Sequence, residues 1–277
     1  MNVFTVETGN FKLDGGAMFG VVPRVIWEKT NPADSNNYCN WAMRCMLIED
    51  GNRLILVDTG IGDKQDEKFF SHFHLNGNAT LEKSLHSLGF HCNDITDVLI
   101  THLHFDHVGG AVRKEGEKFA LTFPNAKYWS NQKHWEWAIQ PNDREKASFL
   151  TENILPIQEL GHLNFIKEGN ELGKNIELLM VDGHTEQQMI PIVNYKGRKV
   201  AFCADLIPSV GHLKLPYIPS YDVRPLVTMQ EKASFLEQAL KDNYVLFFEH
   251  DAYNECCTVK QGERGLKLDS VFNLNEL

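Results

Sequence analysis

Three histidines and one aspartate fall within six residues of the chain, at His102, His104, Asp106 and His107, in the string THLHFDHVGG. Residues 95–100 before this string are apolar and predict a buried strand. In an extended segment, side chains two residues apart point the same way, so His102 and His104 can bind one metal ion. A turn into a following helix then brings Asp106 and His107 to a second position. A histidine-rich surface loop is the weaker interpretation, because composition alone produces an HxHxDH string in roughly one chain in a thousand.

Three further residues with metal-binding side chains follow predicted apolar strands. His184 comes after residues 176–181, Asp205 after residues 199–203, and His250 after residues 245–248. Any one of them alone is more often a capping or core residue than a ligand. Together with the histidine motif, they indicate a metal site built from strand ends, with imidazole and carboxylate donors that suit zinc, manganese, iron or cobalt.

The elements that position these residues are predicted from apolar runs and turn residues. A hairpin is expected from strands 41–48 and 54–57 around the turn 50–52, followed by a helix at 80–88 that stops at Gly89. Residues 131–151 have a helical pattern that Pro141 interrupts, which predicts two helices. Later elements are strands 176–181, 189–195, 199–203 and 245–248, a tight turn at 196–198 and a helix at 226–240.

Two segments far apart in the chain have a similar pattern. Residues 52–60 (NRLILVDTG) and 198–206 (RKVAFCADL) each contain a turn, a basic residue, an apolar strand and an aspartate at its end. This similarity predicts an α/β fold of two β-rich halves packed face to face with helices outside, a four-layer αββα sandwich. Since no linker or repeat interrupts the chain, we expect residues 1–277 to form a single domain.

The composition excludes several classes of protein. The chain has 277 residues, 43% of them hydrophobic, and a formal net charge of −10. Disorder is therefore not expected, and the acidic balance disfavours a nucleic-acid partner. The sequence shows neither a secretory signal nor a membrane span. Six cysteines without CxxC spacing suit free thiols in a reducing compartment, so a cytoplasmic location is expected.

These residues resemble the pattern of the metallo-β-lactamase-fold hydrolase superfamily, in which HxHxDH, a later His, an Asp and a final His bind two metals, usually zinc. The resemblance implies that His102, His104 and His184 bind the first metal ion and that Asp106, His107 and His250 bind the second. Asp205 would bridge the two ions. Asp58, in VDTG, resembles the family's early strand-end aspartate and would support the site from beneath.

The resemblance also implies a mechanism. Two divalent cations about 3.5 to 4 Å apart activate a hydroxide between them and polarise a substrate carbonyl. Asp106 would then be catalytic, binding the second metal and orienting the hydroxide. Cys203 lies two residues before Asp205 on the same predicted strand. We expect it to be a buried structural thiol rather than a ligand, which argues against the β-lactam branch of the family.

Residues 13–23 (LDGGAMFGVVP) resemble the opening of the lactonase-like subgroup, which includes quorum-quenching acyl-homoserine lactonases and the methyl parathion hydrolase type. Met18, Phe19 and Val22 in this segment would line a pocket, form a dimer face or pack in the core. Many acyl-homoserine lactonases have a tyrosine three residues beyond the bridging aspartate, whereas this chain has Pro208. Tyr217 and Tyr221 follow nearby and are candidates for the same role. The additional histidines, His72, His74 and His212, are expected at the surface or at a pocket rim.

The function expected from this resemblance is a dinuclear zinc hydrolase that opens a small-molecule lactone or ester, with homodimerisation left open. One alternative is cleavage of phosphotriesters or glutathione thioesters. A glutathione site would be expected to use basic residues near the C-terminus, where residues 260–277 contain Lys260, Arg264 and Lys267. Another alternative is a non-hydrolytic iron-binding module. Such proteins generally carry a flavin-binding domain, for which this sequence shows no segment.

Overall fold

The computed structural model describes residues 1–167, 171–263 and 265–277. The chain forms two compact units, and each unit combines two separate stretches of sequence. The first unit contains Met1–Gly9 and Met43–Lys174, and the second contains Asn10–Ala42 and Asn175–Leu277. Two long strands, β1 (Asn2–Asp14) and β2 (Tyr38–Asp50), contribute residues to both units.

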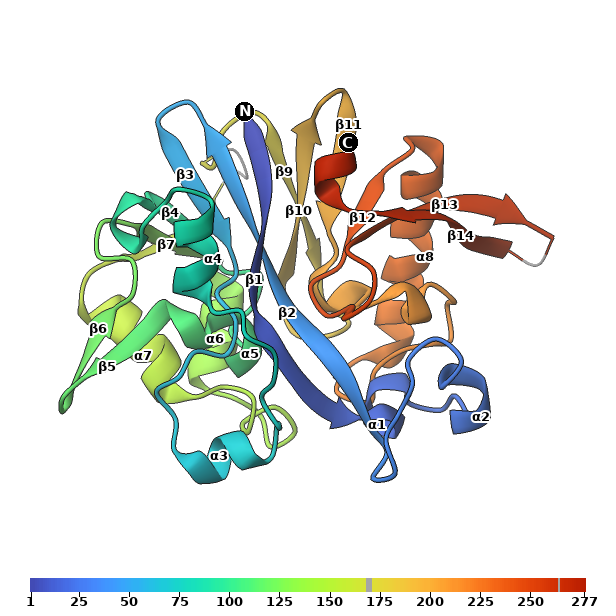
Figure 1. The fold of residues 1–277 in the computed structure, drawn as a ribbon, viewed down its shortest axis with the longest axis horizontal. Helices are drawn as coiled ribbons and strands as arrows, with labels where there is room; N and C mark the ends of the chain where they lie inside the picture. Colours follow the sequence, from blue (N-terminus) through green and yellow to red (C-terminus); the bar gives the residue numbers. More distant parts are fainter. Residues whose placement is uncertain (168–170, 264) are drawn as a thin grey trace. The chain divides into compact units, whose positions relative to one another are not determined.

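The first sheet has the strand order β1-β2-β3-β4-β7-β8 (Figure 1). Strand β3 pairs antiparallel with β2 through a tight hairpin and parallel with β4, and β7 and β8 continue the parallel part. The remaining strands of the first unit are β3 (Arg53–Val57), β4 (Asp97–Leu99), β5 (Val112–Glu115), β6 (Lys118–Leu121), β7 (Lys127–Ser130) and β8 (Leu163–Phe165). Its helices are α3 (Glu67–Ser71), α4 (Leu81–Ser87), α5 (Phe105–Val108), α6 (Gln132–Ile139) and α7 (Thr151–Glu159), with short 3-10 turns at η1 (Cys92–Asp94) and η2 (Gly109–Ala111).

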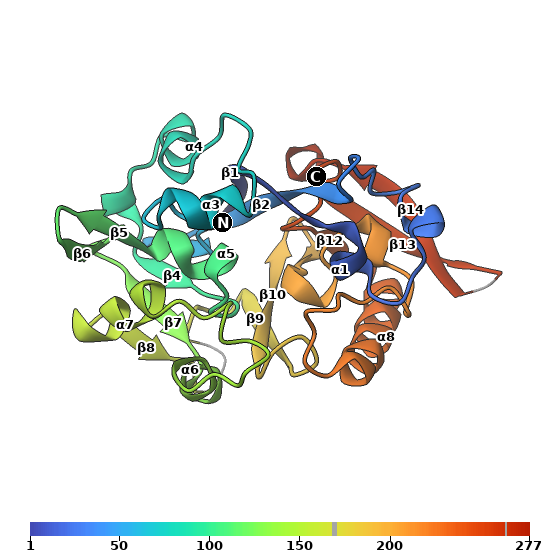
Figure 2. The same ribbon diagram turned by 90° about the horizontal axis from the view of Figure 1, so that it is seen from below.

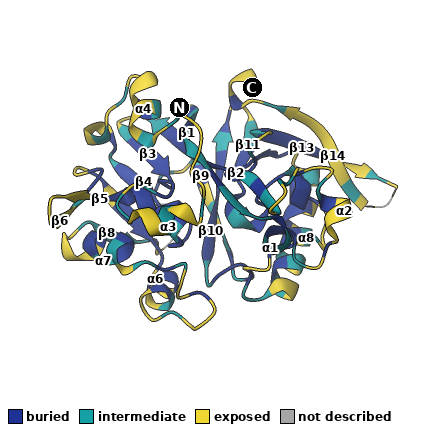
Figure 3. Ribbon diagram, turned by 60° about the horizontal axis from the view of Figure 1, so that its bottom comes forward, coloured by how far each residue is buried: buried dark blue, intermediate teal, exposed yellow. Residues whose placement is uncertain are grey.

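The second sheet has the order β14-β13-β12-β11-β10-β9. Strand β11 pairs antiparallel with β10 and parallel with β12, and helix α8 lies beside β13 (Figure 2). Strand β14 at the sheet edge is largely exposed (Figure 3), whereas β11 and β12 are largely buried. The strands are β9 (Ile176–Val181), β10 (Gln188–Tyr195), β11 (Arg198–Phe202), β12 (Val245–Phe247), β13 (Cys256–Gly262) and β14 (Gly265–Phe272). The helices are α1 (Gly15–Phe19), α2 (Arg24–Trp27) and α8 (Pro225–Lys241), with 3-10 turns at η3 (Ala204–Leu206), η4 (Val210–His212) and η5 (Leu274–Glu276).

The two similar segments identified in the sequence occupy equivalent places in their own sheets. Strands β3 and β11 each have an antiparallel neighbour on one side and a parallel neighbour on the other. Backbone pairing continues past each strand, from Asp58 N–H to Leu99 O (2.9 Å) and from Cys203 N–H to Phe247 O (2.9 Å). The prediction of an α/β fold with two mixed sheets and helices is therefore confirmed.

One local prediction differs from the structure. Residues 131–151 contain one helix, α6, rather than two, and the next helix, α7, begins at Thr151. The Asn142 side chain accepts hydrogen bonds from the N–H groups of Arg144 and Glu145, which favours turns after Pro141 over a helix. Residues 15–19 form the short helix α1, whose N–H at Ala17 is capped by Asp14.

The side chains of Met18, Phe19 and Val22 are buried, so core packing is the alternative that the structure supports for them. The six cysteines are free thiols, and all are buried except the half-buried Cys92. Among the residues that the structure describes, every helix is too short or too polar to cross a bilayer.

A buried carboxylate joins three strands of the first sheet. Asp97 on β4 accepts hydrogen bonds from Arg53 Nε (3.0 Å) and Nη2 (2.7 Å) on β3, and from Trp129 Nε1 (2.8 Å) on β7. Burial by itself would raise the pKa of Asp97, but the hydrogen bonds from Arg53, Trp129 and Thr96 lower it below its ordinary value of 3.8. The ionised form is therefore the one that stabilises the sheet.

We expect Asp97→Asn to lower the free energy of unfolding by about 2 kcal/mol at pH 7, because Arg53 and Trp129 lose a charged acceptor. Since the folded pKa lies below the unfolded one, this contribution is complete above pH 3.8 and is lost as pH falls through the folded pKa. Denaturant titrations of the wild type and of Asp97→Asn should show a difference in the free energy of unfolding that narrows only at acid pH. Asp143→Asn, at an ion pair whose carboxylate is 97% exposed, is the control and should change little. An equal difference in the free energy of unfolding at all pH values would contradict this role of the ionised Asp97.

Candidate metal centre

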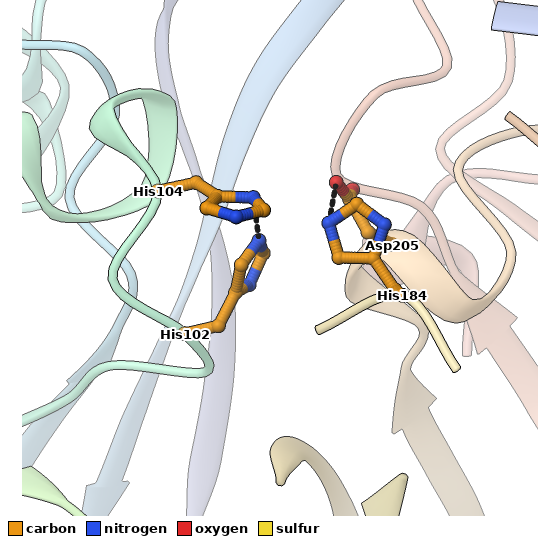
Figure 4. Close-up of side chains that lie close together, drawn as sticks. All are labelled: His102, His104, His184 and Asp205. Atoms are coloured by element: carbon orange, nitrogen blue, oxygen red, sulfur yellow. Dashed lines mark hydrogen bonds and ion pairs between the residues drawn. The ribbon is translucent and has the colours of Figure 1, made fainter. Parts of the chain in front are cut away.

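The residues of the histidine motif form a buried group at the end of strand β4 in the first unit. Residues 100–104, with bends at Thr101 and His104, connect β4 to helix α5, which carries Asp106 and His107. Nε2 of His102 lies 3.1 Å from Nδ1 of His104 (Figure 4). His102 and His107 are fully buried, and Asp106 is 9% exposed.

Hydrogen bonds to Asp58 fix the positions of the protons on two of these rings. Thr101 Oγ1 donates its single proton to Asp58 Oδ2 (2.6 Å), so it can only accept from His102 Nδ1 at 3.1 Å. His107 Nδ1 lies 3.1 Å from the same Asp58 oxygen and donates to it. In both rings the proton is therefore on Nδ1, and Nε2 carries a lone pair that can bind a cation. Asp58 thus has the supporting role predicted for it.

Two residues from other elements orient the loop between the histidines. The N–H of Leu103, between His102 and His104, donates to Nε2 of His134 (2.8 Å) on helix α6. The buried carboxylate of Glu145 lies 3.5 Å from Nε2 of His104, which favours a proton on that nitrogen and a lone pair on Nδ1.

Two glycines of the motif allow this loop to pack against residues 59–62. A Cβ atom at Gly109 would lie 2.0 Å from the carbonyl oxygen of Ile61, and one at Gly110 would lie 2.2 Å from that of Thr59. Both contacts are with backbone atoms, so any larger residue would force the two loops apart. The close packing permits the bond from Thr59 N–H to His107 O (2.8 Å), which fixes the helix α5 that carries His107.

The second unit brings its three candidate ligands together around one carboxylate. His184 Nε2 lies 3.1 Å from Asp205 Oδ2, and His250 Nε2 lies 3.0 Å from Asp205 Oδ1 (Figure 4 shows His184 and Asp205). The other nitrogens are anchored: Nδ1 of His184 donates to Asp222 (2.8 Å) and Nδ1 of His250 donates to the carbonyl of Ala42 (2.8 Å). Both Nε2 atoms therefore present lone pairs toward the carboxylate.

Helix α8 holds the turn that carries His184. Thr228 Oγ1 donates to Asp222 Oδ2 (2.5 Å), and Glu231 accepts from the N–H groups of Asp182 (2.7 Å) and Gly183 (3.0 Å). Burial raises the pKa of Glu231 above its ordinary value, and the hydrogen bonds from these two N–H groups offset only part of this rise. A Cβ at Gly183 would lie 2.3 Å from the backbone nitrogen of Thr228, so only glycine permits this approach.

These two groups of donors fit divalent metal ions. Imidazole nitrogens with lone pairs face carboxylate oxygens at 3.0–3.1 Å in the second unit, and acceptors at that distance repel one another unless a proton or a cation lies between them. Nitrogen and oxygen donors of this kind, with the far nitrogen of each ring anchored, are typical of zinc ligands. All seven predicted site residues belong to one or the other group.

Cys203 is fully buried, as predicted, and burial raises the pKa of its thiol well above the ordinary value. Its predicted geometry was wrong, because strand β11 ends at Phe202 and Asp205 lies in the 3-10 turn η3. Ala204 within that turn has a φ of 40°, a left-handed conformation that is costly for a residue with a Cβ.

Several supporting residues were not predicted from the sequence, namely His134, Glu145, Asp222 and Glu231. Each is distant in sequence from the residue it supports and has no motif, so no local signal could have identified it. The prediction for His212 was wrong, since this ring is fully buried. His72 and His74 are exposed, as predicted, while Tyr217 is half-buried and Tyr221 is exposed.

The sequence model of the metallo-beta-lactamase superfamily matches residues 44–250. An N-acyl homoserine lactonase of Bacillus thuringiensis is 25% identical over 229 residues, which cover 78% of this chain and 84% of that protein. A probable metal-dependent hydrolase from Staphylococcus aureus has a similar structure, with a TM-score of 0.89 and 28% identity over 100% of this chain and 98% of that one. The dizinc quorum-quenching lactonase AidC shares the fold, with a TM-score of 0.81 and 23% identity over 98% and 95% of the two chains.

We expect Asp222→Asn to weaken metal binding by about 10- to 100-fold, because His184 loses the charged acceptor that fixes its Nδ1 proton. Competition with a chromophoric chelator measures the affinity. Asp242→Asn, at an exposed carboxylate that accepts a hydrogen bond from the nearby Gln238, is the matched control. Equal affinities in the two variants would show that Asp222 does not act through His184.

Proposed function

Because the chain belongs to the metallo-β-lactamase superfamily, we propose that it is a dinuclear metal-dependent hydrolase that opens lactone or ester bonds of small molecules. The observation that carries this proposal is the set of buried imidazoles in each unit whose far nitrogens are anchored by Asp58, Asp222 and Ala42. Such anchoring holds the lone pairs ready for cations. The lactonase relatives support an ester bond as the one that is cleaved.

In this proposal residues 1–277 form a single domain, and seven of its residues bind two metal ions. His102, His104 and His184 would hold the first ion, Asp106, His107 and His250 would hold the second, and Asp205 would be a ligand of both. Zinc suits these donors best, with manganese, iron or cobalt as alternatives. When bound, the ions lower the pKa of water and polarise the carbonyl of the substrate. A cytoplasmic location and homodimerisation stay part of the proposal.

The chain's own residues supply orientation and proton transfer. Asp106, whose carboxylate is slightly exposed, would orient the attacking water, accept a proton from it and pass that proton to the leaving alkoxide oxygen of the substrate. Asp58 keeps His107 in one tautomer, and Asp222 does the same for His184.

An aromatic cluster beside the motif suits an apolar acyl group on the substrate. Phe105 lies between His104 and Asp106 in the chain, and its ring is 5.4 Å from that of Phe69 and 4.8 Å from that of Phe73. All three rings are only partly buried. A lactone or ester with an aliphatic chain would cover this surface, since apolar area removed from water stabilises the complex.

The alternatives have less support in the structure. Of the basic residues considered for a glutathione site, Lys260 is paired with Asp269 (2.7 Å) and Arg264 lies outside the described residues. Phosphotriester cleavage would use the same metal pair, so an activity assay is needed to distinguish it from lactone opening. A non-hydrolytic iron module has no observation in its favour.

The test is a panel of acyl-homoserine lactones, aryl esters, a phosphotriester and a glutathione thioester, assayed with the zinc-loaded protein. We expect turnover of a lactone or an ester that a chelator abolishes and added zinc restores. The absence of chelator-sensitive turnover on every lactone and ester would refute the proposal. Turnover confined to the phosphotriester or the thioester would support an alternative instead.

His102→Ala tests the ligand assignment. Elemental analysis of this variant should show a loss of about one of two metal ions per chain, because the ring nitrogen supplies a first-metal ligand. His72→Ala, at an exposed histidine outside the motif, is the control and should keep its full metal content. Equal metal content in the two variants would contradict the assignment.

A further inference from the structure

Lys232, in the middle of helix α8, is a fully buried lysine that donates to three backbone carbonyls of a single loop. Its Nζ lies 3.1 Å from the carbonyl oxygen of His212, 3.0 Å from that of Lys214 and 2.7 Å from that of Tyr217. The side chain is 1% exposed. Burial lowers the pKa of Lys232 to about 7, and three carbonyl acceptors are the partners that the ammonium form requires.

The same loop, residues 209–217, is fixed on its other side by His212. Nε2 of this ring donates to the carbonyl of Met18 (2.9 Å), so Nδ1 accepts from Ser209 Oγ at 2.8 Å. The His212 ring stacks on Phe19 with centroids 4.4 Å apart and planes 7° apart. Burial lowers the pKa of His212 to about 3, which keeps the ring neutral and suits this bonding pattern.

The loop adjoins the metal ligands of the second unit. It begins four residues after Asp205, and the N–H of Val210 donates to Asp251 Oδ2 (2.9 Å), next to His250. At its far end, the half-buried Tyr217 has an edge-to-face contact with Phe19, with ring centroids 6.3 Å apart. The loop is therefore tied to the neighbour of one ligand and follows another closely in the chain.

Lys232 shares one face of α8 with two residues that hold the His184 turn. Thr228, Glu231 and Lys232 are spaced three and four residues apart, which places them on the same side of a helix. Thr228 and Glu231 position His184 through Asp222 and the turn at Gly183. One helix face thus fixes both a ligand and the neighbouring loop.

We propose that Lys232 is a positioning residue that determines specificity: by fixing the loop 209–217, it shapes the substrate-binding surface beside Asp205 and His250. This inference rests on the proposed function for its kinetic consequence but not for its structural one. Besides the 3-10 turn η4 and the bond from Val210 N–H to Asp251, this loop is held by the side-chain hydrogen bonds of Lys232 and His212. A loosened loop binds larger substrates less well, because the loop then loses conformational entropy when the substrate binds.

The structural part is tested by hydrogen exchange of the zinc-loaded protein. In Lys232→Met the three carbonyls lose their donor, and we expect the amides of residues 209–217 to exchange about tenfold faster or more. Lys241→Met, at an exposed lysine in the last turn of α8, is the matched control and should leave this segment unchanged. Unchanged exchange in Lys232→Met would overturn the inference. Lys232→Gln, which keeps two donors, should give an intermediate rate and serves if the methionine variant does not fold.

The kinetic part compares a long-chain acyl lactone with a small aryl acetate. We expect Lys232→Met to raise KM for the long-chain lactone about tenfold while kcat changes by less than about twofold. KM for the aryl acetate and the metal content should stay at their wild-type values. Equal changes for both substrates, or metal loss, would show a general structural role and overturn the specificity assignment. If the wild type hydrolyses neither substrate, the proposed function fails, whereas the exchange result still decides whether Lys232 orders the loop.

Discussion

An imidazole binds a cation only through a nitrogen that carries no proton, and the candidate metal centre depends on this constraint. His102, His107, His184 and His250 each have Nδ1 fixed by an acceptor, which leaves Nε2 as the ligand atom. The acceptors are of three kinds, a hydroxyl, two carboxylates and a backbone carbonyl. Each ring is therefore oriented before any metal binds, so less conformational entropy is lost on binding.

Two aspartates of the candidate site, Asp58 and Asp205, follow strands, because a strand ends at a fixed point of its sheet. Asp58 follows β3 and Asp205 follows β11, and each of these strands is held between an antiparallel and a parallel neighbour. Both positions include unusual backbone, with positive φ at Asp58 and at Ala204. Such conformations cost about 1–3 kcal/mol each and persist only where the surrounding packing requires them.

Helix α8 holds the turn of a candidate metal ligand and a neighbouring loop in place within the second unit. Its residues Thr228, Glu231 and Lys232 bond to groups on three other segments, and the approach of the His184 turn to the helix is possible only at Gly183. A change at Thr228 or Glu231 would therefore alter metal affinity, whereas a change at Lys232 would alter the order of the loop. Asp97, in contrast, stabilises the first sheet through Arg53 and Trp129, which belong to neighbouring strands of that sheet.

The candidate ligands could be proposed from the sequence, because their chemistry lies in residue type and short spacing. HxHxDH is readable as a string, and His184, Asp205 and His250 follow apolar runs that mark strands. The hairpins and the long helix were predicted for the same reason, since their patterns are local. The residues that support the candidate ligands could not be predicted from the sequence. Each supporting side chain lies 15 to 41 positions from its partner, as for His134, Glu145, Asp222 and Lys232. Burial makes each of these polar side chains need a hydrogen bond without specifying the partner. Only the tertiary structure decides which partner each one meets.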